Sequence, residues 1–425
     1  MGGGLMQLVA YGAQDIYLTG NPQITFFKVV YRRHTNFAME SIEQVFTGNV
    51  TLGKKTTCTI ARNGDLVGRM YLEVDIVYDH TAATMTNQEY AIIGHSMINY
   101  VEVEIGGQAI DKHYGEWLNI WMQLTETEEG SIKHTRLIDG SLQAGQARVV
   151  NTPTANDIRK VYVPLQFWFN RNPGLALPLI ALQYHEVKLN LLLNKKAKCM
   201  YNLATSVKIE NISLYCDYMF LDTDERRRFA QVSHEYLIEQ LQTTGTCSFA
   251  ASKQKVNIPV DFNHPCKQLV WVVQNENNKN SFDFTVNGTG NPAVGLESEQ
   301  EFVTDAVLQL NGHDRFRRRS GSYFRIVQPY QHYGSAPSQG RTNNAAGDTK
   351  NPEYGYIYTY SFALKPAEHQ PSGTCNFSRI DNATLQLTVT AASVASPTTS
   401  KVRVYATNYN VLRIMSGMGG LAYSN

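Results

Sequence analysis

Long apolar runs are missing from this chain of 425 residues. The longest, GLALPLIAL at 174–182, contains Pro178 and reaches only about half of the ~20 residues that a membrane span needs. The opening MGGGLMQLVAYGAQD has neither the basic start nor the sustained apolar segment of a signal peptide. The sequence therefore predicts neither a transmembrane helix nor a cleaved secretion signal.

Cysteines are few and scattered, and no charge of one sign dominates. The absence of any Cys-x-x-Cys pair argues against a zinc ribbon and against a compact disulfide framework, so we expect free thiols in a reducing compartment. Lys plus Arg number 38 and Asp plus Glu number 37, whereas binding to many phosphates usually requires a basic excess. Direct binding of nucleic acid is not expected. The six cysteines are Cys58, Cys199, Cys216, Cys247, Cys266 and Cys375.

The sequence contains partial matches to catalytic and metal-binding motifs, and each lacks a required residue. GHSMI at 94–98 resembles a nucleophile elbow, but Ile98 stands where the sharp turn needs glycine. YHEVKL at 184–189 resembles a zinc-binding His-Glu-x-x-His, but Leu189 replaces the second histidine. A phosphate-binding loop and His-x-His are both absent. We therefore predict no enzyme, and no catalytic, metal or cofactor residue.

Two basic stretches have a structural explanation. In LDTDERRRFAQ at 221–231, Asp222 can cap a helix, and acidic residues stand four positions before Arg226 and Arg228. This pattern predicts a self-paired linker helix. RFRRRS at 315–320 is less neutralised, and a subunit contact is favoured there over a phosphate site.

The chain reads as an internal duplication, with two copies of about 200 residues each. Within the matched segments Gly107 faces Gly312 and Tyr215 faces Tyr405. The order is the same in both copies, and the offset drifts only as loops change length. The matched segments are 42–44 (Ile-Glu-Gln) with 238–240 (Ile-Glu-Gln), 63–74 with 263–274, 101–118 with 306–324, 185–191 with 381–387, and 214–221 with 404–412.

The matched segments alternate with period two, as half-buried strands do. Val101, Val103 and Ile105 share one phase, and glycine-containing turns such as 105–108 and 310–313 separate the runs. Helices are few; 114–129 carries an apolar stripe of Trp117, Ile120, Trp121 and Leu124. Mostly antiparallel domains of this size with occasional loop helices suit a jelly-roll sandwich, so the prediction is all-β, a double jelly roll.

Several long strings resemble the major capsid proteins of nucleocytoplasmic large DNA viruses, and most strongly those of the chlorella viruses (phycodnaviruses). The strings cover nearly the whole chain, whereas 79–92, 126–158, 276–300 and 333–353 depart from the family. They are 5–38, 172–189, 236–242, 362–385 and 408–423.

The resemblance implies a virion protein that forms homotrimers, and the trimers would be pseudo-hexagonal capsomers of an icosahedral shell assembled in the host cytoplasm. Expected partners are neighbouring capsomers, minor capsid proteins and the inner membrane side. The predicted parts are an arm (1–38), a first jelly roll (39–221), a linker helix (222–235) and a second jelly roll (236–425). A carbohydrate-binding tandem β-sandwich and a duplicated-barrel metal enzyme are the alternatives.

Five asparagines satisfy the Asn-x-Ser/Thr pattern for glycosylation. Asn287, in a polar loop, is the best placed, and Asn49 and Asn376 are further candidates. Asn211 and Asn382 lie in or next to predicted strands and are poorer acceptors.

Overall fold

The structure is a computed structural model, and the chain divides into two compact units, Met1–Phe37 and Ala38–Asn425. The first unit contains two short helices, α1 (Gly3–Val9) and α2 (Ile16–Thr19). Within the described ranges no helix has the length and apolar character to cross a membrane. The structure describes residues 3–79, 93–139, 157–199, 206–250, 253–276, 282, 284, 301–333, 356–390 and 399–423.

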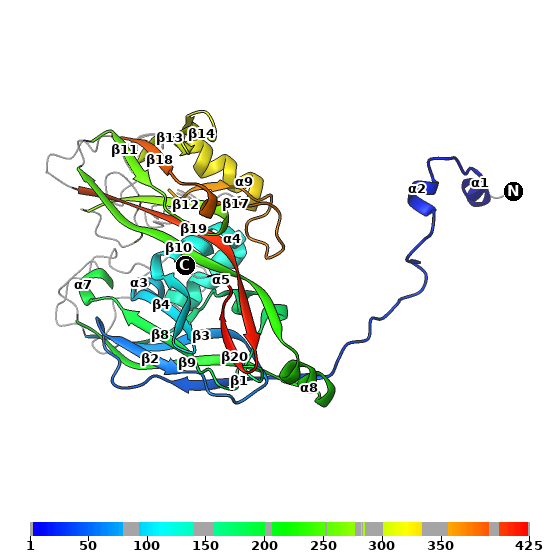
Figure 1. The fold of residues 1–425 in the computed structure, drawn as a ribbon, viewed down its shortest axis with the longest axis horizontal. Helices are drawn as coiled ribbons and strands as arrows, with labels where there is room; N and C mark the ends of the chain where they lie inside the picture. Colours follow the sequence, from blue (N-terminus) through cyan, green and yellow to red (C-terminus); the bar gives the residue numbers. More distant parts are fainter. Residues whose placement is uncertain are drawn as a thin grey trace. The chain divides into compact units, whose positions relative to one another are not determined.

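A first sandwich is built from strands of the amino-terminal half (Figure 1). Its strands are β1 (Phe37–Val45), β2 (Lys55–Thr59), β3 (Leu66–Asp79), β4 (Ile98–Ile105), β5 (Gln108–Tyr114), β6 (Asp157–Pro164), β7 (Leu177–Pro178), β8 (Val187–Leu193) and β9 (Ser206–Leu221). One sheet has the order β1-β9-β3-β6, with β7 beside β3, and the other has the order β2-β8-β4-β5.

A second sandwich follows in the carboxyl-terminal half. Its strands are β10 (His234–Ala250), β11 (Lys255–Pro259), β12 (Pro265–Asn275), β13 (Val303–Leu310), β14 (His313–Asp314), β15 (Arg319–Ser320), β16 (Tyr358–Ser361), β17 (Cys375–Asn376), β18 (Ala383–Val389), β19 (Thr399–Met415) and β20 (Met418–Leu421). Its sheets have the orders β10-β19-β12-β16 and β11-β18-β13-β14; β17 pairs with β12, β20 with β19 and β15 with β13.

Short helices connect these strands. They are α3 (Ile93–Ser96), α4 (Gly115–Thr125), α5 (Glu128–Asp139), α6 (Trp168–Arg171), η1 (Pro173–Leu175), α7 (Lys196–Cys199), α8 (Thr223–Gln231), the π-helix η3 (Tyr323–Val327), α9 (Gln328–Tyr333) and η4 (Phe377–Arg379). The predicted stripe on α4 is confirmed, because Trp117, Ile120, Trp121 and Leu124 are all buried.

The two sandwiches have the same topology. When the eight principal strands of each are numbered in chain order, one sheet reads 1-8-3-6 and the other 2-7-4-5 in both. In both, helices follow the fifth strand: α4 and α5 after β5, and η3 and α9 after β14 and β15. The described ladders are antiparallel. This is the jelly-roll order twice, so the predicted double jelly roll and its duplication are confirmed.

Equivalent turns join the fourth and fifth strands. Gly106 and Gly107 have φ of 57° and 86°, and Asn311 and Gly312 have φ of 49° and 81°. Both connections are two-residue hairpins with positive φ at both central positions, a geometry that favours Gly and Asn. The predicted equivalence of Gly107 and Gly312 is confirmed.

A second pair of glycines marks where the chain enters the helices after these hairpins. A Cβ atom on Gly115 would lie 2.2 Å from the His95 carbonyl oxygen, and one on Gly321 would lie 1.9 Å from the Val303 carbonyl oxygen. In both sandwiches only glycine lets the chain pass this close to the backbone at the start of the fourth strand.

Strand register also corrects two of the repeat alignments. The offset of 200 placed Met70 opposite Val270. Met70 packs in its own sandwich core, whereas in β12 the residues that face their own core are Leu269 and Trp271. Tyr71 pairs with Tyr215, and Val270 pairs with Tyr405. The true offset here is one residue smaller, and Tyr215 and Tyr405 are equivalent as predicted.

The two Ile-Glu-Gln triplets are not equivalent. Glu239 pairs in register with Tyr409 on β19. Glu43 instead accepts a hydrogen bond from Ser213 of β9. The residue equivalent to Ser213 in the second sandwich is Arg403, and Arg403 pairs with Thr246. Glu43 therefore lies opposite a position that corresponds to the partner of Thr246, not to the partner of Glu239. The match was wrong because three residues of a period-two pattern carry little information, and β10 extends several residues beyond the part that β1 matches.

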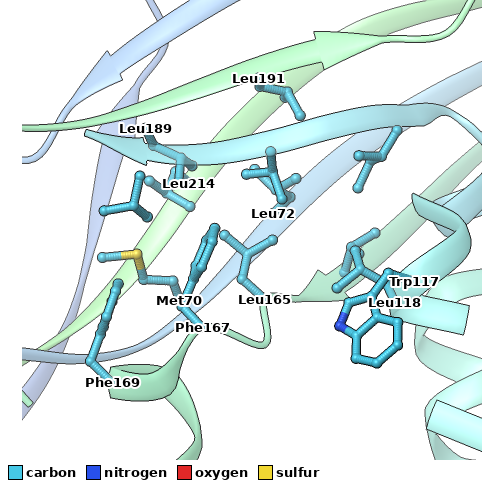
Figure 2. Close-up of a cluster of buried hydrophobic side chains, with 14 of the residues drawn as sticks. Met70, Leu72, Trp117, Leu118, Leu165, Phe167, Phe169, Leu189, Leu191 and Leu214 are labelled. Atoms are coloured by element: carbon cyan, nitrogen blue, oxygen red, sulfur yellow. The ribbon is translucent and has the colours of Figure 1, made fainter. Parts of the chain in front are cut away.

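Apolar side chains fill both sandwiches. In the first, inward residues of β3, β8 and β9 meet Leu165, Phe167 and Phe169, and α4 closes one end with Trp117 and Leu118 (Figure 2). In the second, Trp271, Phe324 and Tyr358 form the centre of a separate cluster. Burial of this area is the main stabilising contribution to each sandwich.

Helix α8 (Thr223–Gln231) lies between the two sandwiches, and Asp222 at its N-cap accepts a hydrogen bond from the Thr223 N–H. The predicted linker helix reached residue 235, but α8 ends at Gln231 and β10 begins at His234. Its expected self-pairing is wrong for Arg226, whose guanidinium lies 3.0 Å from the carboxylate of Asp65. The helix is thereby tied to the start of β3.

Candidate functional site

The junction between the sandwiches is the most elaborate polar site in the described part of the chain. Sheet β10-β19-β12-β16 is buried on both faces: Leu269, Trp271 and Val273 face their own core, while Val270 and Val272 join the cluster of the first sandwich. The outer face of this sheet therefore packs on the first sandwich.

Helix α4 receives one part of that face. Glu116 binds the guanidinium of Arg403 through a 2.7 Å hydrogen bond from Nε and accepts a 3.0 Å bond from the Tyr405 hydroxyl. The Tyr405 ring lies 5.4 Å from that of Trp117. Burial, followed by the charge of Glu116, raises the pKa of Tyr405 well above its ordinary value, so its hydroxyl remains a donor.

A buried carboxylate holds the second part of the junction. Glu239 on β10 is 2% exposed, and its oxygens lie 2.7 Å from Arg171 Nη2 at the end of α6 and 2.8 Å from Lys267 Nζ on β12. His369 Nδ1 lies 3.2 Å away. Lys267 is fully buried and also donates to the Glu368 carbonyl oxygen. Arg171 comes from the first sandwich, so the cluster crosses the junction.

The cluster keeps Glu239 ionised. Burial alone would raise the pKa of Glu239, but Arg171, the His369 hydrogen bond and Lys267 outweigh it and lower this pKa to about 2. Burial lowers the pKa of Lys267 to about 8, although Glu239 opposes that shift. At neutral pH the site holds a carboxylate between two cations.

Backbone contacts extend the junction along the first half of β10 and the carboxyl-terminal hairpin. The Gln240 side chain donates to the Ile110 carbonyl oxygen, and the Leu241 N–H donates to Asp111 at 3.0 Å. On the hairpin, His185 Nδ1 lies 2.9 Å from the Gly419 carbonyl oxygen and 3.1 Å from the Gly419 nitrogen. A Cβ on Gly419 would lie 2.6 Å from Leu182, so this glycine permits the close approach.

The incomplete motifs of the sequence are structural. Ser96 Oγ is buried and donates to the carbonyl oxygens of Ile93 and Cys199. His95 is buried, and burial followed by the nearby His134 holds its pKa well below its ordinary value. Both line a cleft of about 440 Å³ between the sandwiches. His185 contacts the backbone of Gly419, and the described residues contain no group of three potential ligands arranged for a metal ion.

The basic stretch 315–320 lies at β15, directly before η3. Arg318 is bound to Asp305, and Arg319 stacks 4.3 Å from the ring centre of Tyr323. Arg315, Arg317 and Arg319 are exposed. Next to them, Ile326, Val327 and Tyr330 of η3 and α9 are exposed apolar side chains, with Tyr330 72% exposed.

The candidate glycosylation sites differ in accessibility. Asn49 is exposed in the loop between β1 and β2. Asn376 is exposed, but its side-chain oxygen accepts from the Ser378 N–H at 3.1 Å. Asn287 lies outside the described residues. Asn211 is within β9 and Asn382 precedes β18, in the positions that the sequence predicted.

The sequence reasoning missed the Glu239 cluster. Its members are far apart in sequence, and none belongs to a motif. One signal was present: Lys267 interrupts an apolar strand, PCKQLVWVV at 265–273, and a lysine in such a strand needs a buried partner. The sequence could not have named that partner.

Two family models match the chain. The model described as major capsid protein N-terminus matches residues 25–222. The model described as large eukaryotic DNA virus major capsid protein matches 225–343 and 341–420. The boundary between the two models falls at α8, where the two sandwiches meet.

Curated relatives and solved structures agree with these models. The major capsid protein of Pyramimonas orientalis virus is 54% identical over 435 residues, and that of Paramecium bursaria Chlorella virus 1 is 44% identical over 467 residues; each match covers 100% of both chains. A chain of the solved PBCV-1 virus capsid superposes with a TM-score of 0.76 at 40% identity, covering 94% of this chain and 100% of that chain.

Removing the charge of Glu239 tests the junction. In Glu239→Gln, the fully buried Lys267 and the 22% exposed Arg171 lose their counter-ion, so the free energy of unfolding should fall by about 3–5 kcal/mol, measured by urea denaturation at pH 7. The pKa of Glu239 is lowered from 4.5 to about 2, so its contribution is complete above pH 4.5 and disappears as the pH falls towards 2. The variant should therefore lose less stability than the wild type over that acidic window.

Glu235→Gln is the matched control, because Glu235 lies on the same strand and pairs with Arg413 in an exposed ion pair. It should change the unfolding free energy by less than about 1 kcal/mol. Equal losses in the two variants would contradict the role given to the buried cluster.

Proposed function

Because the chain belongs to the family of large eukaryotic DNA virus major capsid proteins, we propose that three copies form a pseudo-hexagonal capsomer of the icosahedral shell. Members of this family are structural proteins of the virion and not enzymes. The observation that carries the proposal is the identical strand order of the two sandwiches. Three chains then provide six similar blocks around one axis, and a threefold ring needs a heterologous interface.

The contact inside one chain is a template for the contact between chains. Within the chain, the outer face of the second sandwich's sheet, through Tyr405 and Arg403, covers the helix α4 that follows the fifth strand of the first sandwich. Six blocks around a ring would repeat this contact between chains. The outer face of sheet β1-β9-β3-β6 in the first sandwich must then cover η3 and α9, the helices that follow the fifth strand in the second sandwich of a neighbouring chain.

The first of these surfaces is open in the described part of the chain. It is the outer face of sheet β1-β9-β3-β6, where Tyr71 stacks on Tyr215 with ring centres 5.2 Å apart and also contacts Tyr162. Tyr215 is the equivalent of Tyr405. These tyrosines are only half-buried, whereas Tyr405 is covered by α4.

The second surface is η3 and α9. In the first sandwich the apolar residues of α4 are buried, and Trp117 contacts Tyr405 of the neighbouring sheet, but Ile326, Val327 and Tyr330 of η3 and α9 remain exposed. An exposed cluster of this kind marks a protein contact. A second copy of the chain carries the half-buried tyrosine face that fits it.

Charge supports the same pairing. The tyrosine face carries Glu43, Glu73 and Asp75; Lys160 pairs with Glu73 and Asp75, and Glu43 accepts a hydrogen bond from Ser213. The exposed arginines beside η3, which include Arg317 and Arg319, have the opposite sign. Complementary potentials favour the correct partner and speed its association. This difference in charge supports the proposal that the basic stretch 315–320 is a subunit contact.

A charge placed in this contact should separate the subunits. Tyr330→Asp puts a carboxylate into the apolar part of the proposed interface, so we expect folded monomers where the wild type forms trimers. Light scattering coupled to size-exclusion chromatography measures the mass, and circular dichroism checks the fold. Val232→Asp is the control, because Val232 is 53% exposed but lies at the end of α8, outside both surfaces.

Trimers that persist in Tyr330→Asp would contradict this interface. A wild-type protein that stays monomeric and is retained on a glycan array would instead support the carbohydrate-binding sandwich. Hexagonal arrays of trimers by electron microscopy would support the capsomer.

We also propose that the arm contributes to contacts beyond the trimer. Among the described side chains of the first unit, the apolar ones are not buried by one another: Leu8, Phe26 and Phe27 are each more than three-quarters exposed. Such side chains need a cover in the assembled shell. Neighbouring capsomers, minor capsid proteins or the inner membrane side would provide it, after assembly in the host cytoplasm.

Deleting residues 1–25 should leave the sandwiches folded and trimeric, because neither sandwich includes those residues in its strands. Assembly of trimers into shells should fail or slow. Thermal unfolding and light scattering on the truncated protein distinguish the two effects. Loss of the monomer fold on truncation would show that the arm belongs to a core.

Glycosylation is proposed at the loop asparagines. Asn49 is the better acceptor of the described candidates, because the side-chain oxygen of Asn376 already accepts a hydrogen bond from the Ser378 N–H. Asn287 stays a prediction. Peptide mass mapping of virion protein should find a glycan on Asn49 that Asn49→Gln removes. An unmodified Asn49 peptide in the wild-type protein would reject this site.

A further inference from the structure

Two of the six cysteines face each other across a pair of strands. In the antiparallel ladder between β12 and β17, Cys266 pairs directly with Cys375, and Pro265 pairs with Asn376. Directly opposed residues in such a ladder have their side chains on the same face of the sheet. These two residues are about 100 positions apart in sequence, so only the fold brings them together.

The spacing of such a pair suits a disulfide. Opposed residues of an antiparallel pair have Cα atoms about 4.5–5.5 Å apart. Disulfides usually join Cα atoms about 4.4–6.8 Å apart. The Cys266 thiol now makes weak contacts of 3.6 Å to the carbonyl oxygens of Asn263 and His264, which a rotation about its χ1 angle would release.

We propose that Cys266 and Cys375 form an intrachain disulfide when the protein meets a small disulfide oxidant such as glutathione disulfide. The bond would fasten the segment 362–376 to β12, next to the ion cluster of Glu239. This assignment does not depend on the trimer.

The two thiols have different roles in the exchange. Cys266 is fully buried, and Cys375 is half-buried at the margin of the second core. The Cys375 thiolate attacks one sulfur of glutathione disulfide and releases a first glutathione thiolate. The Cys266 thiolate then attacks the Cys375 sulfur of the mixed disulfide and releases a second. The two protons lost by the cysteines go to the two glutathiones, and glutathione disulfide is reduced.

The local environment controls the rate of this exchange. Burial raises the pKa of Cys266, and burial also raises that of Cys375, where the nearby Arg315 acts in the opposite direction. Both thiols are thus mostly protonated at neutral pH, and since the thiolate is the nucleophile, oxidation should be faster at alkaline pH. Arg315 favours Cys375 as the first to react.

The segment that the bond would hold already covers the junction. The N–H groups of Phe362 and Ala363 donate to the Lys267 carbonyl oxygen, and His369 contacts Glu239 at 3.2 Å. The Tyr409 hydroxyl donates to the His369 carbonyl oxygen at 3.0 Å. A link at Cys375 would resist opening of this cover, and closing a loop of about 100 residues gives a large entropic stabilisation.

The proposed disulfide would form at a particular stage, because the redox environment differs inside and outside the cell. Thiols remain reduced in a cytosolic compartment, whereas disulfides persist on particles outside the cell. A shell protein that folds reduced and is oxidised after release would become more stable once refolding is no longer needed.

The test compares reduced and oxidised full-length protein. Purified protein is incubated with glutathione disulfide at pH 8.5, free thiols are alkylated, and peptides are mapped by mass spectrometry without reduction. We expect a linked peptide pair that contains Cys266 and Cys375, and a rise in Tm on the order of 5 °C that dithiothreitol reverses.

Two serine variants distinguish a specific Cys266–Cys375 disulfide from nonspecific oxidation of other thiols. Cys375→Ser should abolish both the linked peptides and the Tm shift. Cys247→Ser should keep both, because Cys247 is equally half-buried in the same cluster but pairs with Val402. Recovery of Cys266 and Cys375 as separately alkylated peptides after oxidation of folded protein would overturn the proposal. A link from Cys375 to Cys247 or to a second chain would overturn it equally.

Discussion

Burial of both faces of sheet β10-β19-β12-β16 is the constraint on which the rest of this molecule depends. Its inner face closes the second sandwich around Trp271, and its outer face, through Val270 and Val272, continues the core of the first sandwich. A sheet buried on both sides cannot leave a charge without a partner, because transfer of an unpaired ion into the interior costs several kcal/mol. The charges here are all paired, because Glu239 binds both Lys267 and Arg171. The ion pair with Arg171 crosses the junction and so orients one sandwich on the other.

The duplication explains how one chain could occupy two places in the proposed ring. Equivalent positions have kept the backbone geometry and changed the chemistry: Gly115 and Gly321 both permit the same close approach, whereas Ser213 corresponds to Arg403. Arg403 is bound to Glu116 inside the chain. The face around Tyr215 has no such partner in the described part of the chain, and in the proposed trimer a neighbour would cover it. In the proposed trimer, divergence after duplication would thus separate a contact within the chain from a contact between chains.

Much of the fold could be predicted from the sequence because strands and tight turns have local signatures. Period-two runs such as Val101 to Ile105 placed the strands, and the hairpin glycines at 107 and 312 placed equivalent turns. The same periodicity misled the alignment of the two Ile-Glu-Gln triplets. Two period-two strands can be aligned at many shifts of two residues. Only the cross-strand register, such as the pairing of Glu239 with Tyr409, shows which alignment is correct. The self-pairing expected for Arg226 failed for a similar reason, since Asp65 is near it only in space.

The sequence by itself determined the strand pattern, the duplication and the family, because these rest on local periodicity, turn chemistry and long matching strings. Only the tertiary structure decided which residues meet across the fold. Glu239 is an ordinary strand glutamate until α6 brings Arg171 to it, and Cys266 and Cys375 are scattered cysteines until β17 pairs with β12. Contacts of this kind depend on register between distant strands. That register is set by the packing of whole sheets, and no short stretch of sequence records it.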